Sequence, residues 1–139
     1  FSNQNFSKLD RKMNQKTTIQ IFCEINPSED SEKVKLAVSN IFPDIELEIS
    51  DTDITGKTNN LAILSQILKS IREKNVKKTY QRILKNNNDG ESTWFYLNKQ
   101  AAFVNTVSLS SEANESSLGP IKVILRSNDI EQVIDSITN

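Results

Sequence analysis

The chain has 139 residues, of which 36% are hydrophobic and 25% charged, and this is the composition of one ordinary globular domain. Its formal net charge is −1, so a nucleic-acid partner has to be argued from local clusters of charge. One cysteine and no histidine exclude an intrachain disulfide, the histidine-dependent catalytic triads and histidine-containing zinc sites.

The beginning of the chain divides at Met13. Residues 1–12 are polar and lack periodicity, so we expect a disordered or expression-derived tail followed by a single domain over residues 13–139. No apolar run is long enough to span a bilayer, which predicts a cytoplasmic protein without a membrane partner.

Alternating apolar residues over positions 17–25 predict the first strand, half-buried in the sheet. Cys23 lies on its core side and is expected to be a small buried hydrophobe, because no histidine is present to activate the thiol. A helix capped by Ser28 or Asp30 is predicted next. Its apolar residues follow helical spacing: Val34, Ala37, Val38 and Ile41.

Pro43 ends this helix, and a second strand is predicted directly after it. Its apolar residues are Ile45, Leu47 and Ile49, and they alternate with the acidic Asp44, Glu46 and Glu48. Such a strand has one apolar face and one strongly acidic face.

A polar loop leads into two further helical patterns. The apolar residues are Leu61, Leu64, Ile67, Leu68 and Ile71 in the first, and Val76, Tyr80, Ile83 and Leu84 in the second. Asn75 either separates two helices or lies inside one long helix. Residues 86–90 predict a turn. Three strands over 93–98, 103–109 and 121–126 follow, and a helix over 128–137 closes the chain.

The predicted element order is β-α-β-α-α-β-β-β-α. Because the strands cluster late and helices do not alternate with every strand, we expect a two-layer α+β fold with a mixed, mostly antiparallel sheet and helices on one face. The other face of the sheet is then open to solvent or to a partner.

Residues 55–58 read Thr-Gly-Lys-Thr, like the end of a P-loop between the second strand and the second helix. The P-loop spacing requires a glycine where the chain has Asp51, whose carboxylate would repel a phosphate. We interpret Asp51 and Asp53 as solvated turn formers rather than as ligands of a cation. The sequence therefore predicts no enzyme, no cofactor, no metal and no small-molecule substrate.

Basic residues gather between positions 69 and 85, which hold seven of the chain's 17 basic residues and one of its 18 acidic residues. The seven are Lys69, Arg72, Lys74, Lys77, Lys78, Arg82 and Lys85. In one continuous helix, Lys74, Lys78, Arg82 and Lys85 would form a cationic stripe opposite Tyr80. A solvated helix face is the ordinary explanation, but the acids lie elsewhere instead of neutralising the stripe at i, i+4. The pattern thus favours a helix surface that binds phosphates, and it argues against the open sheet face as that surface, because the acids of the second strand would line it.

Three aromatic residues are adjacent at positions 94–96. Alternation places Trp94 and Tyr96 on one face of their strand and Phe95 on the other, so one set enters the core. An RNA-recognition motif would have glycines here, and none lies between Gly90 and Gly119. We therefore expect the outer face, with Phe22 and Ile124, to be an apolar surface covered by a partner subunit rather than a platform for bases.

Four stretches resemble a family of small, uncharacterised archaeal proteins: 27–30 (PSED), 40–44 (NIFPD), 95–104 (FYLNKQAAFV) and 118–121 (LGPI). Members are described as predicted RNA-binding or exosome-associated proteins, and the similarity covers residues 13–137. It implies an α+β fold similar to that of the large-subunit ribosomal protein that binds 5S RNA. The chain departs from the family pattern at Ser117, where a proline is usual.

The leading hypothesis is a non-catalytic RNA-binding module of RNA processing or translation. Lys74, Lys78, Arg82 and Lys85 would contact phosphates, helped by Lys69, Arg72 and Lys77. Asn98, Lys99 and Gln100 are expected to contact either RNA or the backbone of a tight turn. The alternative is a homodimeric protein-interaction scaffold that uses the outer sheet face, with the basic residues only solubilising the protein.

Overall fold

The computed structural model describes residues 17–110 and 119–138. The expected tail at 1–12, the start at Met13 and the departure at Ser117 lie outside these residues. The strands are β1 (Thr18–Glu24), β2 (Leu47–Ile49), β3 (Asp53–Thr58), β4 (Ser92–Leu97), β5 (Leu109–Ser110) and β6 (Ile121–Arg126). The helices are α2 (Ser31–Ile41), α3 (Ser65–Lys74), α4 (Lys77–Asn86), α5 (Lys99–Phe103) and α6 (Ile130–Thr138), with a 3-10 turn η1 (Leu61–Leu64) before α3.

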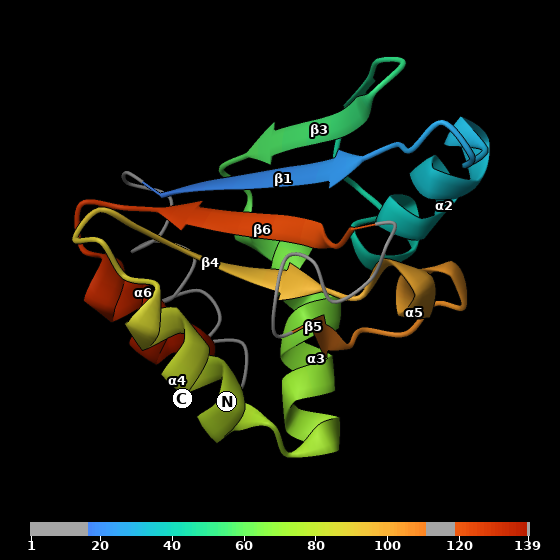
Figure 1. Cartoon of the computed structure of the whole chain (residues 1–139). Helices are drawn as coiled ribbons and strands as arrows, with labels where there is room; N and C mark the ends of the chain where they lie inside the picture. The colour runs from blue at the N-terminus through green and yellow to red at the C-terminus, as the bar shows by residue number, and fades with distance from the viewer. Residues whose placement is uncertain (1–16, 111–118, 139) are drawn as a thin grey trace.

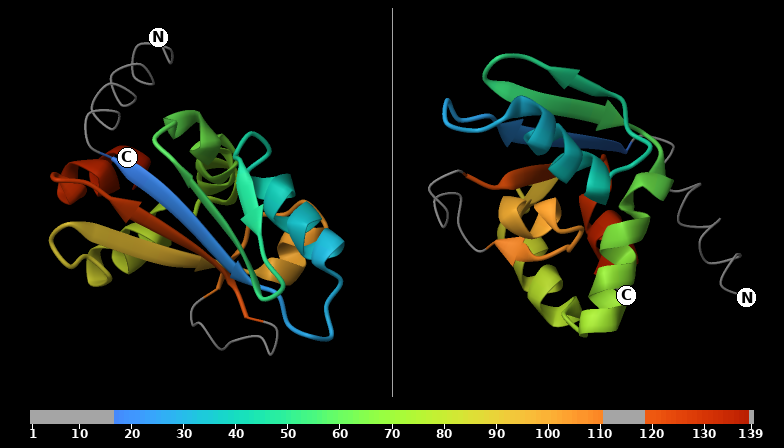
Figure 2. Two further views of the ribbon diagram at one scale, coloured as in Figure 1. Left: turned by 90° about the horizontal axis from the view of Figure 1, so that it is seen from above. Right: turned by 90° about the vertical axis from the view of Figure 1, so that its right-hand side faces the viewer.

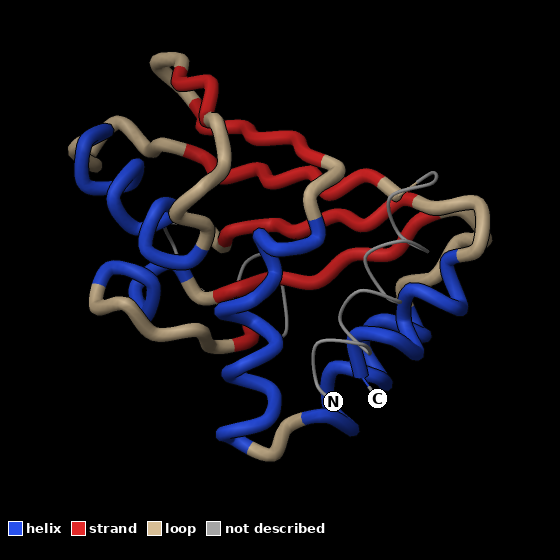
Figure 3. Tube along the Cα trace, turned by 180° about the vertical axis from the view of Figure 1, so that it is seen from behind, coloured by secondary structure: helices blue, strands red, loops and turns tan. Residues whose placement is uncertain are grey.

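The six strands form one sheet in the order β2-β3-β1-β6-β4-β5, and every neighbouring pair is antiparallel. The helices cover one face of this sheet, as Figure 1 shows from the front and Figure 3 from behind. The view from above in Figure 2 shows β1, β6 and β4 side by side with helices behind them. The predicted two-layer α+β fold is confirmed, and the described sheet is antiparallel throughout.

The core lies between the sheet and the helices, and alternation along each strand supplies it. On β1, Ile19, Ile21 and Cys23 are buried, whereas Gln20 and Phe22 point to the opposite face. The helix α2 contributes the four apolar residues that its spacing predicted. Asp30 caps this helix, since its carboxylate accepts a hydrogen bond from the backbone N–H of Glu32 at 3.0 Å.

The basic segment forms two helices rather than one. Asn75 adopts a left-handed conformation, with φ of 53°, and its N–H closes the end of α3 on the carbonyl of Arg72. The new helix α4 begins two residues later, at Lys77. The prediction of one continuous stripe from Lys74 to the cations of α4 is therefore wrong, because helical periodicity does not continue across the break.

Residues 55–58 lie inside β3 and not in a loop, so they do not have the backbone geometry of a P-loop. Gly56 pairs with Ile21 of β1, and a Cβ there would lie only 2.8 Å from Cδ1 of Ile45. The glycine thus makes room for the Ile45 side chain, which is partly buried and packs against the core. The turn between β2 and β3 is held by Ser50, whose N–H and hydroxyl both donate to the carbonyl of Asp53.

The predicted strand over 103–109 is also wrong. Residues Lys99–Phe103 form the short helix α5, and only Leu109–Ser110 pair with β4 as a strand. The chain returns to β4 through a loop in which Asn105 adopts a left-handed conformation.

Candidate nucleic-acid interface

The helix α4 presents a cationic face to solvent. Its opposite side is fixed in the core by Tyr80 and Leu84, and the Tyr80 ring packs edge-on against Phe95 with centroids 5.6 Å apart. Three exposed cations at the spacing i, i+4, i+7 share the outer side of the helix: Lys78, Arg82 and Lys85. We call these three residues the α4 cationic face.

No described carboxylate neutralises this face. Across residues 17–110 and 119–138, the ion pair between Lys99 and Glu29 is the only one within 4.0 Å. The remaining predicted cations, Lys69, Arg72, Lys74 and Lys77, are exposed as well. Lys74 differs from them, because its ammonium donates to the backbone carbonyl of Val107 at 2.5 Å. It therefore ties α3 to the loop before β5.

The polar residues after β4 have separate roles. Asn98 caps α5, since its side-chain oxygen accepts a hydrogen bond from the N–H of Ala101 at 2.9 Å. Lys99 is only 1% exposed, and its ammonium is enclosed within the protein, where it binds a backbone carbonyl, the second of its two expected roles. Gln100 is exposed. The structure thus separates the three residues instead of gathering them into one polar site.

Lys99 forms the centre of a buried polar junction. Its ammonium donates to the carbonyl of Glu24 at 2.7 Å and to the Glu29 carboxylate at 3.1 Å. Burial alone would raise the pKa of Glu29, but hydrogen bonds from Asn26 and Lys99 outweigh this effect and hold the pKa below its ordinary value. Burial raises the pKa of the adjacent Cys23 thiol to about 11, opposed by the charge of Lys99.

The junction joins the stretches that carry the family resemblance. Lys99 follows the strand that contains Phe95, and Glu29 belongs to the stretch 27–30. A second bridge runs from Asn40, whose amide donates to the carbonyl of Ala102 at 2.9 Å. The helices α2 and α5 pack against each other at this place (Figure 1). These contacts therefore join β1, α2 and α5 at one end of the sheet.

The open face of the sheet is a second candidate surface, for which the sequence predicted apolar side chains beside the acids of the second strand. The pairing register places Phe22, Lys122 and Tyr96 in one row across β1, β6 and β4. The next row holds Lys57, Gln20, Ile124 and Trp94, and Arg126 follows on β6. The expected aromatic alternation is confirmed, because Phe95 and Leu97 are buried whereas Trp94 and Tyr96 are partly exposed on this face.

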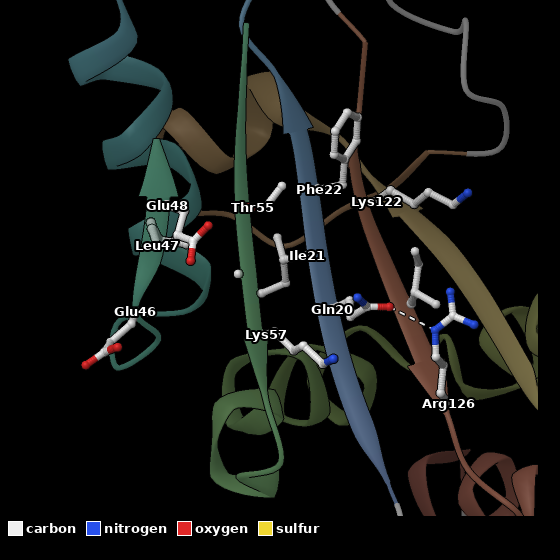
Figure 4. A pocket seen from close by; sticks show the side chains of 12 residues that line it. Gln20, Ile21, Phe22, Glu46, Leu47, Glu48, Thr55, Lys57, Lys122 and Arg126 are labelled. Atoms are coloured by element: carbon white, nitrogen blue, oxygen red, sulfur yellow. Dashed lines mark hydrogen bonds between the residues drawn. The ribbon is translucent and has the colours of Figure 1, made fainter. Parts of the chain in front are cut away.

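A hollow of about 690 Å³ crosses this face from β2 to β6 (Figure 4). Glu46 and Glu48 line its wall at β2, as the acidic face of the second predicted strand implied, whereas Asp44 is not part of the lining. Its other walls carry three cations: Lys57, Lys122 and Arg126. Arg126 donates from Nε to the Gln20 side chain at 2.8 Å, and Figure 4 shows its terminal nitrogens turned away from Gln20.

The ammonium of Lys122 lies over the two partly exposed rings of β4. It stands 5.3 Å from the ring centroid of Trp94 and 6.0 Å from that of Tyr96, which are cation-π distances. The alternation of strand 121–126 carried the signal for Lys122 and Arg126, since both share the parity of Ile124. Lys57 could not be found in this way, because β3 was expected to be a loop.

Neither a metal site nor a membrane-spanning helix is found among the described residues. Groups of three or more histidine, cysteine, aspartate or glutamate side chains that could hold a metal ion do not occur among them. Within the same residues, no helix is both long enough and apolar enough to cross a membrane.

Comparison with known proteins identifies close relatives. A family model described as RNA binding matches residues 18–127. A UPF0201 protein of Methanothermobacter thermautotrophicus is 39% identical over 119 residues, covering 84% of this chain and 87% of the relative. A UPF0201 protein of Metallosphaera sedula is 32% identical over 122 residues, covering 86% and 85%. The crystal structure of the UPF0201 protein from Methanococcus jannaschii matches with a TM-score of 0.74 and 28% identity, covering 88% of this chain and 99% of that one.

Proposed function

Because the chain belongs to the RNA-binding family whose model spans residues 18–127, we propose that it is an RNA-binding module that holds the phosphate backbone through the α4 cationic face. The observation that carries this proposal is the placement of Lys78, Arg82 and Lys85. All three are exposed on one side of a helix whose other side is locked in the core, and no described acid pairs with them.

The chemistry of these side chains fits phosphates better than bases. Each cation that meets a phosphate releases condensed counterions, which favours binding without reading sequence. The helix is held rigidly, since it packs against β4 and α6 and its Leu84 carbonyl accepts a hydrogen bond from the Thr93 hydroxyl at 2.6 Å. Three cations held in a fixed row would match the regular spacing of phosphates along an RNA backbone. Such a module would act in RNA processing or translation, the settings that the family resemblance implies.

The neighbouring cations extend the proposal. Lys77 begins the same helix, and Lys69 and Arg72 lie three residues apart on α3, where both are exposed. They would add phosphate contacts where the RNA reaches beyond α4. We assign Lys74 a smaller share, because its ammonium already binds the Val107 carbonyl.

A matched pair of double variants tests this assignment. Lys78→Gln/Arg82→Gln removes two charges from α4, and Lys33→Gln/Lys35→Gln removes two exposed charges from α2, on the other side of the molecule in Figure 1. Fluorescence anisotropy with end-labelled RNA should show weaker binding for the α4 variant and unchanged binding for the α2 variant. Equal affinities of both variants and the parent would place the RNA elsewhere on the protein.

A further inference from the structure

We propose that the open face of the sheet binds unpaired bases of single-stranded RNA, which stack on Trp94 and Tyr96 while Lys122 and Arg126 meet the adjoining phosphates. This inference rests on the proposed function and deepens it by naming the kind of RNA. The α4 cationic face would hold the backbone of any RNA, whereas the sheet face would select strands whose bases are free to turn outward.

The two rings are placed so that each can take its own base. Trp94 and Tyr96 are two residues apart on β4, and at the rise of an antiparallel strand their Cα atoms are separated by about 6.8 Å. Both side chains are partly exposed on the face that no described helix covers. Base stacking tolerates any sequence, because every base has a π-face. A row of this kind therefore suits unpaired RNA of varied sequence.

The cations are placed where the backbone of such a strand would run. Lys122 lies across from Tyr96 in the sheet register, and Arg126 lies four residues further along β6. Lys57 adds a third charge on β3, but it lines the hollow together with Glu46 and Glu48. The backbone would therefore follow Lys122 and Arg126 on β6. The ammonium of Lys122 already stands over both rings, and its flexible stem allows it to move to a phosphate when bases take its place. Aromatic rings interleaved with cations are the pattern of single-strand-binding surfaces.

A second copy of the chain fits this face less well. The exposed Phe22 and the neighbouring Ile124 would suit a dimer interface. However, the centre of the face holds Lys122, and lysine is depleted from interface cores because its ammonium loses water there without an assured partner. In a twofold interface whose axis passes near Lys122, this cation would also approach its own copy. Phosphate and bases satisfy both features of the face, the charges and the rings.

The chain offers a direct probe, because Trp94 is its only tryptophan. We would titrate the unmodified protein with a single-stranded RNA of about 12 nucleotides, within the site sizes of small single-strand-binding domains, and with a duplex of the same length. Binding is followed by anisotropy of the RNA, and stacking by quenching of tryptophan emission. The single strand should quench the emission as it binds, and the duplex should bind through α4 without quenching it.

Variants test the contribution of each ring. Trp94→Ala and Tyr96→Ala should each weaken binding of the single strand at least about 5-fold and leave duplex binding unchanged. Trp94→Phe keeps a ring and should retain most of the affinity. Leu36→Ala removes an exposed apolar side chain of α2, away from the sheet, and should have no effect. Circular dichroism of each variant checks that the fold is intact.

The outcomes separate this inference from the proposed function. If the single strand binds but tryptophan emission does not change, and both alanine variants bind as the parent does, the sheet face is not the base site while RNA binding stands. If neither RNA binds at low salt, both proposals are refuted. If the free protein sediments as a dimer that Trp94→Ala dissociates, the face joins two copies and the inference is wrong.

Discussion

Replacement of Lys99 by methionine tests whether the residues of the family resemblance hold the fold together. Methionine keeps the length of the buried stem and removes only the ammonium. Glu29 then keeps its hydrogen bonds from Asn26 but loses its cation, and the Glu24 carbonyl loses a donor. The side chains of the pair are 1% and 6% exposed, so water cannot replace what is lost without a rearrangement.

Breaking a buried pair by removing one partner typically costs about 3–5 kcal/mol, because an uncompensated charge stays behind. We expect Lys99→Met to lower the free energy of unfolding by about this amount at neutral pH. This loss of unfolding free energy should become smaller as the pH is lowered. Since the pKa of Glu29 is held below its ordinary value of 4.5, the pair stabilises the protein above pH 4.5, and that contribution is lost as the pH falls through the lower, folded-state pKa.

Urea denaturation followed by circular dichroism measures these free energies. The double variant Glu29→Gln/Lys99→Met should be more stable than Lys99→Met alone, since it leaves no buried charge behind. Lys33→Met serves as the control, because Lys33 is exposed on α2 and surface changes usually stay within about 0.5 kcal/mol. A cost below about 1 kcal/mol for Lys99→Met would refute the argument that this junction secures the fold.

Two further predictions concern residues at the same end of the sheet. Burial raises the pKa of the Cys23 thiol to about 11, so Ellman's reagent should label it at pH 8 only after the protein unfolds. The free energy of unfolding should also fall as the pH rises from 9.0 towards 11. Rapid labelling of the native protein would contradict this prediction. Asn98→Ala removes the cap of α5 and should cost about 1 kcal/mol in thermal unfolding without changing RNA affinity, whereas a loss of affinity would give Asn98 a contact with RNA.

Periodicity predicted much of the fold because most elements bury one regular face. The four apolar residues of α2 and the alternation around Cys23 needed no tertiary information. The strand β3 was missed because its sequence, DITGKT, has a single large apolar residue, Ile54. Gly56 belongs in that strand for a reason that only the packed structure supplies, the approach of the Ile45 side chain.

The short helix α5 could have been found. Asn98 is a favoured N-cap, and the residues KQAA after it are good helix formers, but the apolar residues at 103, 107 and 109 suggested a strand. The role of Lys99 could not have been found, because lysine is almost never fully buried and its partner Glu29 lies 70 positions earlier in the chain.

The candidate site was predicted in part, for a related reason. The cations of α4 could be identified because they lie close together in the sequence. Helical periodicity wrongly joined them to Lys74, because the left-handed Asn75 ends α3 before α4 begins. The mixture of rings and charges on the sheet face depends on the register between β1, β6 and β4. Contacts between distant strands of this kind are set by the tertiary fold, so a single sequence does not display them.

The salt dependence of RNA binding tests the central claim most directly. The logarithm of the affinity should fall linearly with the logarithm of the salt concentration, with a slope of about −0.7 for each phosphate contacted on a single strand. Removing Lys78 and Arg82 as the double glutamine variant should make the slope shallower by about 1.4, while Lys33→Gln/Lys35→Gln should leave it unchanged. A slope that is identical for the parent and both variants would show that the α4 cationic face does not contact RNA.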